Sequence, residues 1–227
     1  MTHSIRISWL LLGTGILITT SPVLAEPGYD ALMKQAKQNI SDDKLEEADK
    51  AFEQAYRLAS NDNQKALALA KRGEMMVYYQ KKFTQAKEMV NYARRFPQRE
   101  DQTNIILFQV EAACKMKGEK KYKEATVFLL EASKLDTDDT SELITYMMLG
   151  DCYRLDKQYQ KALDAYTQVT QLSNAAKDGR SAAHMNSGII YQYRLKKNDL
   201  AKAEYKKAVA LNPSLKSQTR KLIDSME

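Results

Sequence analysis

The sequence predicts an all-α protein, a solenoid of about five helix pairs followed by a capping helix. Three observations support this fold class. The chain has 227 residues but only eight glycines and four prolines, too few turn-forming residues for an all-β fold. Its hydrophobic content of 44% argues against disorder, and its mean hydropathy of −0.56 argues against a protein with several membrane spans. An alanine-based pattern also recurs at nearly constant intervals, which is typical of stacked helical repeats.

The N-terminal 25 residues have the pattern of a secretory signal peptide. Arg6 provides a positive charge, and Trp9–Ile18 is an apolar run too short for the roughly 20 residues of a membrane-spanning helix. Val23 and Ala25 supply the small residues of a cleavage site. We therefore predict a signal peptide at 1–25 and export of the chain, to the periplasm if the source is a diderm bacterium and otherwise by secretion. The alternative is an uncleaved anchor, which is the only case in which we expect membrane association.

The remainder of the chain repeats an alanine, an aromatic or aliphatic residue four positions later, and an alanine or valine three positions after that. The first alanines are Ala48, Ala86, Ala125, Ala162 and Ala201. They lie 38, 39, 37 and 39 residues apart. Their counterparts on the preceding helices are also small: Ala36, Gly73, Ala113, Gly150 and Gly188. Glycine costs about 1 kcal/mol relative to alanine inside a helix, so its recurrence here indicates close helix–helix contact.

The fourth and fifth repeats carry the most specific motif. The fourth contains Tyr146-x2-Leu149-Gly150-x2-Tyr153, followed by Ala162 and Tyr166. This resembles the tetratricopeptide repeat (TPR), W-x2-L-G-x2-Y…A-x3-F…P, with tyrosine in place of tryptophan. The resemblance implies a right-handed α-solenoid and a single domain over 26–227. The repeats then fall at about 29–62, 67–97, 105–136, 143–173 and 181–213, and the residues in excess of the family's 34-residue period fit the links between pairs.

Residues 214–226 form one more amphipathic segment. Its apolar stripe consists of Leu215, Leu222, Ile223 and Met226. Stacked repeats leave an apolar end that must be covered, so we interpret this segment as the capping helix. A partner-binding tail is the alternative.

Motifs for catalysis or metal binding do not occur in the sequence. His184 is the one histidine after residue 25, which excludes a site built on several imidazoles of one chain. Acidic pairs such as Asp42-Asp43 and Asp138-Asp139 are interpreted as caps at helix N-termini. We predict no enzymatic activity, no cofactor and no metal site.

The two cysteines, Cys114 and Cys152, allow a disulfide in an exported protein. They fall one residue out of phase on the first helices of adjacent repeats. Neighbouring helix axes lie about 8–10 Å apart, whereas a disulfide needs Cα atoms within about 7 Å. We therefore favour two buried free thiols, with the disulfide as the alternative.

The chain is basic, with 35 Lys or Arg against 29 Asp or Glu, a formal charge of +6 and a pI of about 9.1. Basic stretches are short, such as Lys120-Lys121 and Lys196-Lys197. We interpret them as solvated helix faces with a mild preference for acidic partners or anionic lipid surfaces. Mixed charge and expected export predict no nucleic-acid partner.

The TPR resemblance implies a concave groove that is lined by the first helix of each pair and takes up a peptide. We place the groove on the stripe offset from the packing stripe. The predicted residues are Met33, Lys37, Lys71, Met75, Tyr78, Val110, Lys117, Met147, Asp151, Arg154, Met185, Ile189 and Gln192, with Tyr79 and Tyr193 at the edges of the groove. Methionine adapts to irregular apolar partners and lysine meets carboxylates, so we expect an apolar or mildly acidic polypeptide segment as partner. The alternative is that the methionines complete the core.

These observations predict a non-catalytic protein–protein interaction scaffold or adaptor in the cell envelope. The alternative function is a structural or oligomerising component that uses the convex face or the C-terminal helix.

Overall fold

The computed structural model describes residues 11–12, 15–16 and 27–226. The predicted signal peptide lies outside the described residues, apart from two strands of two residues each. Strands β1 (Leu11–Leu12) and β2 (Gly15–Ile16) pair antiparallel, with Leu11 opposite Ile16.

Residues 27–226 form helices joined by short turns. The first helices of the five pairs are α1 (Tyr29–Ser41), α3 (Asp62–Tyr78), α5 (Asp101–Ala113), α7 (Asp139–Leu155) and α9 (Lys177–Tyr193). The second helices are α2 (Leu45–Leu58), α4 (Phe83–Ala93), α6 (Tyr122–Ala132), α8 (Tyr159–Gln171) and α10 (Asn198–Leu211). A π-helical turn, η1 (Cys114–Gly118), continues α5. A short 3₁₀ turn, η2 (Pro213–Leu215), leads into α11 (Lys216–Asp224).

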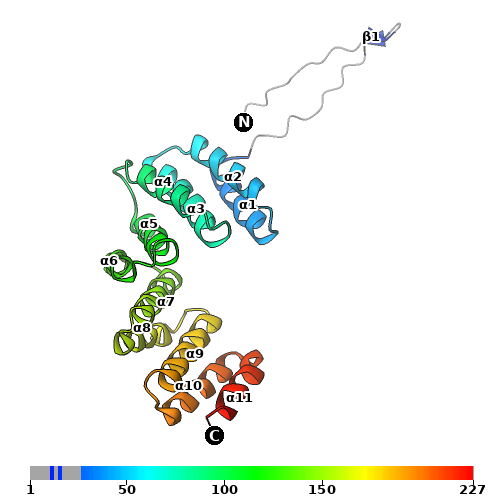
Figure 1. Cartoon of the computed structure of the whole chain (residues 1–227). Helices are drawn as coiled ribbons and strands as arrows, with labels where there is room; N and C mark the ends of the chain where they lie inside the picture. Colours follow the sequence, from blue (N-terminus) through cyan, green and yellow to red (C-terminus); the bar gives the residue numbers. More distant parts are fainter. Residues whose placement is uncertain (1–10, 13–14, 17–26, 227) are drawn as a thin grey trace.

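The helix pairs stack into an open arc (Figure 1). The first helix of each pair lies on the inner side of the arc, and α6, α8 and α10 lie on its outer side. The all-α solenoid with a capping helix that the sequence predicted is confirmed for residues 27–226. None of the helices in this part of the chain combines the length and apolarity needed to cross a bilayer.

Two of the recurring glycines allow helices to pack against a tyrosine ring. A Cβ atom on Gly150 would lie 2.3 Å from Cε1 of Tyr166, and one on Gly188 would lie 2.5 Å from Cε1 of Tyr205. Both rings are fully buried. At Gly73 the nearest atoms would be 3.5 Å from an added Cβ, an ordinary contact distance. The expected requirement for glycine therefore holds at Gly150 and Gly188, whereas Gly73 has room for a methyl group.

The turn inside each pair contains one residue in the left-handed backbone conformation. These residues are Asp43, Lys81, Lys120, Lys157 and Lys196, with φ of 58°, 55°, 56°, 62° and 56°. L-amino acids disfavour this region and glycine usually occupies it. Lys120-Lys121 and Lys196-Lys197 thus lie in turns between helices, and their interpretation as helix faces was wrong.

The acidic pairs have different positions. Asp42 follows the last residue of α1 and Asp43 lies in the turn, so their interpretation as N-terminal caps was wrong. Asp138 is an N-cap: its Oδ1 accepts a hydrogen bond from the backbone N–H of Ser141 at 2.8 Å. This cap fixes the start of α7, the helix that carries the TPR-like motif of the fourth repeat.

The capping helix α11 is connected to the last repeat through Gln192. The Nε2 atom of this buried glutamine donates to the carbonyl of Leu222 at 3.1 Å and to Oγ of Ser225 at 3.0 Å. Its Oε1 accepts from the Tyr205 hydroxyl at 2.7 Å. Leu222 and Ile223 pack on the same apolar cluster as Tyr205. A single side chain on α9 therefore joins α10 to α11.

Replacing Gln192 by leucine is expected to loosen α11. The substitution leaves the Tyr205 hydroxyl without its partner and removes one of the two hydrogen bonds to the Leu222 carbonyl, which keeps the bond from Ser225 Oγ, at a cost of about 1–3 kcal/mol. Hydrogen exchange followed by mass spectrometry should show faster exchange of α11 amides. Gln160→Leu, at an exposed site on α8, is the matched control and should leave that exchange unchanged. Equal α11 exchange in wild type and Gln192→Leu would show that apolar packing alone holds the capping helix.

Candidate functional site

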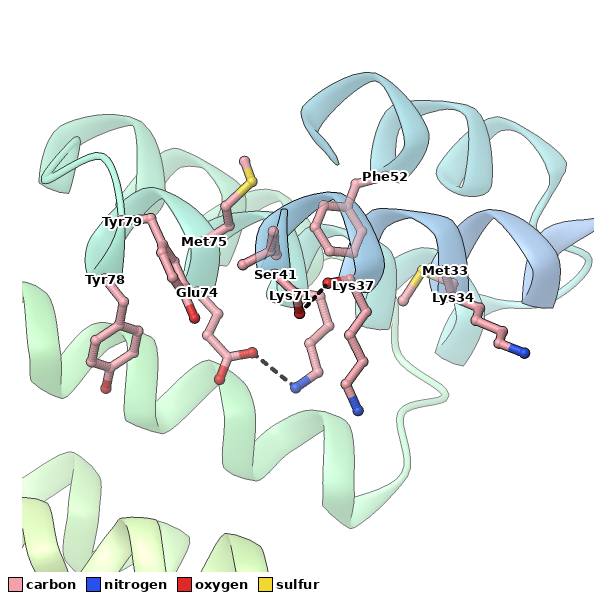
Figure 2. Close-up of a pocket in the computed structure, with 11 residues that line it drawn as sticks. Met33, Lys34, Lys37, Ser41, Phe52, Lys71, Glu74, Met75, Tyr78 and Tyr79 are labelled. Carbon is pink, nitrogen blue, oxygen red and sulfur yellow. Dashed lines mark hydrogen bonds and ion pairs between the residues drawn. The ribbon is translucent and has the colours of Figure 1, made fainter. Parts of the chain in front are cut away.

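A cavity of about 710 Å³ lies between α1 and α3 and extends to Tyr79, the first residue of the turn between α3 and α4. Figure 2 shows its side chains, which come from α1, α2 and α3 and the residue after α3. The lining residues are Met33, Lys34, Lys37, Ile40, Ser41, Phe52, Lys71, Glu74, Met75, Tyr78 and Tyr79. This volume falls within the range of sites that bind small ligands or a few side chains.

The lining is apolar at depth and aromatic at one edge. Phe52 and Met75 are 3% and 1% exposed and form buried parts of the wall. Tyr79 is 57% exposed and stands at the edge beside Tyr78 (Figure 2). The positions on α3 are spaced i, i+4 and i+7 from Lys71, so one helical face presents them together. The site can therefore bury an apolar side chain and stack an extended backbone against tyrosine.

Three lysines and one glutamate give the cavity a positive balance. Lys71 Nζ lies 2.8 Å from Glu74 Oε2, one helical turn along α3. Lys34 and Lys37 are exposed and make no ion pair with another described residue. In Figure 2 the amino groups of Lys37 and Lys71 extend to the same side as the Glu74 carboxylate. An exposed ion pair such as Lys71–Glu74 contributes little free energy, so the Lys71 amine can leave Glu74 and bind a carboxylate of a partner.

Tyr78 extends the cavity edge towards the third and fourth repeats. Its hydroxyl donates to the Met148 sulfur at 3.4 Å, and Lys117 Nζ lies 4.3 Å from the centre of its ring. Burial raises the pKa of Tyr78 well above its usual value and lowers the pKa of Lys117. The phenol is therefore neutral at physiological pH, and it connects side chains of three repeats on the inner side of the arc.

Of the residues predicted for the groove, five line this one cavity: Met33, Lys37, Lys71, Met75 and Tyr78. The predicted residues of the third, fourth and fifth repeats do not line this cavity. Val110, Met185 and Gln192 are buried and present no open surface. Met147 and Ile189 are half-buried and pack against core clusters.

Asp151 and Arg154 serve as a connection between α7 and α8. The Tyr166 hydroxyl donates to Asp151 Oδ1 at 2.8 Å, and Arg154 Nη2 lies 3.1 Å from the same oxygen. Burial raises the pKa of the Tyr166 phenol, and the Asp151 carboxylate adds to that rise. In the fourth repeat the predicted groove residues Asp151 and Arg154 thus have a structural role, because the Tyr166 side chain is long enough to contact them.

The predicted groove residues did not include six of the lining residues, although Tyr79 was expected at the edge of the groove. Five of them lie next to a predicted residue in the sequence or one helical turn away from it: Lys34, Ile40, Ser41, Glu74 and Tyr79. Extending the predicted stripe by one turn would have found most of them. Phe52 comes from α2 and was assigned only to packing, so no stripe on the first helices could indicate it.

The two cysteines are free and buried, as the sequence analysis favoured. Burial raises the pKa of Cys114 to about 11 and that of Cys152 to about 12, so both stay protonated and unreactive at physiological pH. Within the described residues no cluster of His, Cys, Asp or Glu side chains could hold a metal ion.

Comparison with known proteins supports the repeat assignment. The family model "Tetratricopeptide repeat" matches residues 144–175 and 181–215. No curated protein sequence matches the chain at a significant level.

Several solved structures have a similar fold at low sequence identity. One is a chain of the APC/C hetero-tetramer Cut9-Hcn1, with a TM-score of 0.69 and 19% identity over 87% of this chain. This chain spans only 36% of that one. A second is YrrB, a TPR protein described as having an unusual peptide-binding site, with a TM-score of 0.52 and 22% identity over 81% of this chain and 86% of that one. A third is MamA, with a TM-score of 0.57 and 17% identity over 80% of this chain and 96% of that one. The chain thus contains two helix pairs with a tetratricopeptide-repeat sequence, at 144–175 and 181–215, within a solenoid whose fold is similar to these structures.

Proposed function

We propose that this protein is a non-catalytic interaction scaffold that holds a polypeptide segment in the cavity between α1 and α3. The observation that carries the proposal is the lining of that cavity, which combines a buried apolar wall with exposed tyrosines and unpaired amines. YrrB, a solved TPR structure with a similar fold, is described as having a peptide-binding site, which supports a peptide as the ligand class.

The charges of the cavity define the segment further. Lys34, Lys37 and Lys71 outnumber Glu74, so the preferred segment has a carboxylate close to an apolar side chain. The apolar side chain would contact Phe52 and Met75, and the carboxylate would lie within reach of Lys37 and Lys71. An all-basic segment would meet uncompensated positive charge and bind more weakly.

The setting is part of the proposal and is supported by the sequence alone. The pattern at 1–25 favours export, so we place the scaffold in the cell envelope, in the periplasm of a diderm source. The intact mass of the protein purified from its source tests this step. A chain that begins at Glu26 supports export, and a chain that retains residues 1–25 contradicts cleavage.

A second candidate function is oligomerisation through the outer helices. It is favoured by exposed apolar side chains on α4 and α6, namely Tyr92, Val127 and Leu130. Tyr92 also packs edge-on against Tyr56 and Phe96, which gives the outer side an aromatic cluster. Aromatic side chains of this kind are enriched in protein interfaces.

Site-specific photocrosslinking in the source cells distinguishes the two functions. A benzophenone amino acid replaces Tyr79 at the cavity edge or Tyr92 on the outer side. We expect a discrete crosslinked polypeptide from position 79, and we expect Lys37→Glu/Lys71→Glu to reduce its yield at least tenfold.

The control is the same pair of reversals at Lys50 and Lys123, exposed lysines outside the cavity, which should leave the yield unchanged. Crosslinking from position 92 alone, with a product of twice the chain mass, would establish oligomerisation and contradict the cavity. A product from position 79 that is insensitive to Lys37→Glu/Lys71→Glu would also contradict it.

A further inference from the structure

The turns inside the five helix pairs hold the excess positive charge of the chain. Residues 41–44, 79–82, 117–121, 155–158 and 193–197 contain ten Lys or Arg and four Asp or Glu, a net charge of +6. The whole chain carries a formal charge of +6 as well. The helices and links outside these turns are therefore balanced, and the basic pI arises from the turns.

Four of these turns place lysine at the position that glycine, asparagine or aspartate fills most easily. Lys81, Lys120, Lys157 and Lys196 have φ between 55° and 62°. A lysine in this conformation is locally unfavourable, and its recurrence in four successive pairs is not explained by backbone preference. Unfavourable conformations that persist are concentrated at functional positions, so the side chain itself is the feature to explain.

The lysine amines are available to a partner. Six of them, at positions 81, 82, 120, 157, 196 and 197, are exposed and make no ion pair with any other described residue. Of the turn lysines, Lys121 pairs with Glu119 and Glu124, and Lys44 lies 3.9 Å from Asp42. We call the exposed lysines at 81, 82, 120, 157, 196 and 197 the basic edge.

Exposed apolar side chains accompany the basic edge. Tyr79, Leu155 and Tyr193 are 57%, 40% and 47% exposed and precede a left-handed lysine by two or three residues. Because successive pairs stack in the same orientation, the turns of neighbouring pairs lie on the same edge of the solenoid. Lysine beside tyrosine or leucine suits a bilayer interface, where amines meet headgroups and apolar parts enter the acyl boundary. A purely ionic partner would leave these apolar side chains in water.

The geometry points to the basic edge as a docking surface for an anionic lipid bilayer. The amines contact lipid phosphates, and Tyr79, Leu155 and Tyr193 provide shallow apolar contacts. This surface is distinct from the cavity between α1 and α3, although Tyr79 borders both. Docking along the turns leaves the inner side of the arc open to a polypeptide.

Vesicle sedimentation of the full-length chain tests this inference. The vesicles contain phosphatidylcholine alone or with about 30% phosphatidylglycerol. The variant is Lys81→Gly/Lys120→Gly/Lys157→Gly/Lys196→Gly, in which glycine is compatible with the turn backbone, so loss of binding cannot be attributed to unfolding. The control removes the same charge at four exposed helix lysines, as Lys50→Gln/Lys123→Gln/Lys161→Gln/Lys206→Gln.

We expect wild type and the helix control to partition onto the anionic vesicles. The turn variant should bind at least about tenfold more weakly, since each lysine near an anionic surface contributes about fivefold. The apolar run Trp9–Ile18 is common to all three proteins, so it cannot produce the difference. Equal binding by the turn variant and the control would overturn the inference, as would binding to soluble polyglutamate but not to anionic vesicles.

Discussion

The double substitution Gly150→Ala/Gly188→Ala is expected to destabilise the last two helix pairs by about 2–6 kcal/mol. Each added methyl group would lie 2.3 to 2.5 Å from a buried tyrosine ring, at Tyr166 or Tyr205. Neither ring can retreat into solvent, and overpacking of this kind costs about 1–3 kcal/mol per site, occasionally more. The two sites are in different helix pairs, so their effects should add. Urea unfolding followed by circular dichroism at 222 nm measures the change.

Gly73→Ala is the matched control for this prediction. Gly73 occupies the equivalent position in the second pair, but an added methyl group would meet its neighbours at 3.5 Å. Because alanine has a higher helix propensity than glycine and meets no clash here, the substitution should raise the free energy of unfolding by about 1 kcal/mol. Destabilisation of similar size at all three glycines would contradict the explanation by tyrosine.

A rescue experiment isolates the contact further. The third pair has Ala113 and Leu129 where the fourth has Gly150 and Tyr166, and both of the former are fully buried. Gly150→Ala/Tyr166→Leu copies that combination. Its loss of stability should be smaller than the sum of the two single losses, because the shorter side chain removes the clash. Additive losses of stability would indicate that the methyl group at position 150 does not clash with the Tyr166 ring.

The repeat spacing predicted the fold because the small residues that permit helix contact are visible in sequence. Gly150 and Gly188 show the limit of that reasoning. Sequence position placed them with Gly73, but only the structure shows which glycine faces a ring. The size of the facing side chain decides this, and it belongs to another helix.

The predicted groove residues of the first two repeats line one cavity, whereas those of the fourth and fifth repeats make contacts within the fold. In α1 and α3 the offset stripe opens on a cavity, because Phe52 stays in the wall and leaves the surface above it free. In α7 and α9 tyrosines from the second helices reach the same stripe. The Tyr166 hydroxyl donates to Asp151 and the Tyr205 hydroxyl donates to Gln192, so two residues of the predicted groove make hydrogen bonds within the fold. The periodicity of residues along one helix does not show how far a side chain from the neighbouring helix extends over that helix.

The left-handed lysines could not have been predicted from periodicity, since their backbone conformation depends on how each pair turns. Lys81→Gly/Lys120→Gly/Lys157→Gly/Lys196→Gly is expected to stabilise the protein by about 2–4 kcal/mol. Left-handed backbone costs an L-residue about 1–2 kcal/mol, and the greater chain entropy of glycine offsets part of the gain, which leaves about 0.5–1 kcal/mol per site. The midpoint of urea unfolding should rise accordingly.

Two controls separate backbone strain from charge in this prediction. Lys81→Gln/Lys120→Gln/Lys157→Gln/Lys196→Gln removes the same four charges but keeps a side chain at each left-handed position, so it should leave stability within about 0.5 kcal/mol of wild type. Lys206→Gly, at an exposed site in the middle of α10, should cost about 1 kcal/mol because glycine is unfavourable in a helix interior. An equal gain from the glutamine variant would assign the effect to charge repulsion between turns. A gain from glycine alone would mean that lysine is kept at these four turns at the expense of stability, which supports a role for the lysine side chain in binding.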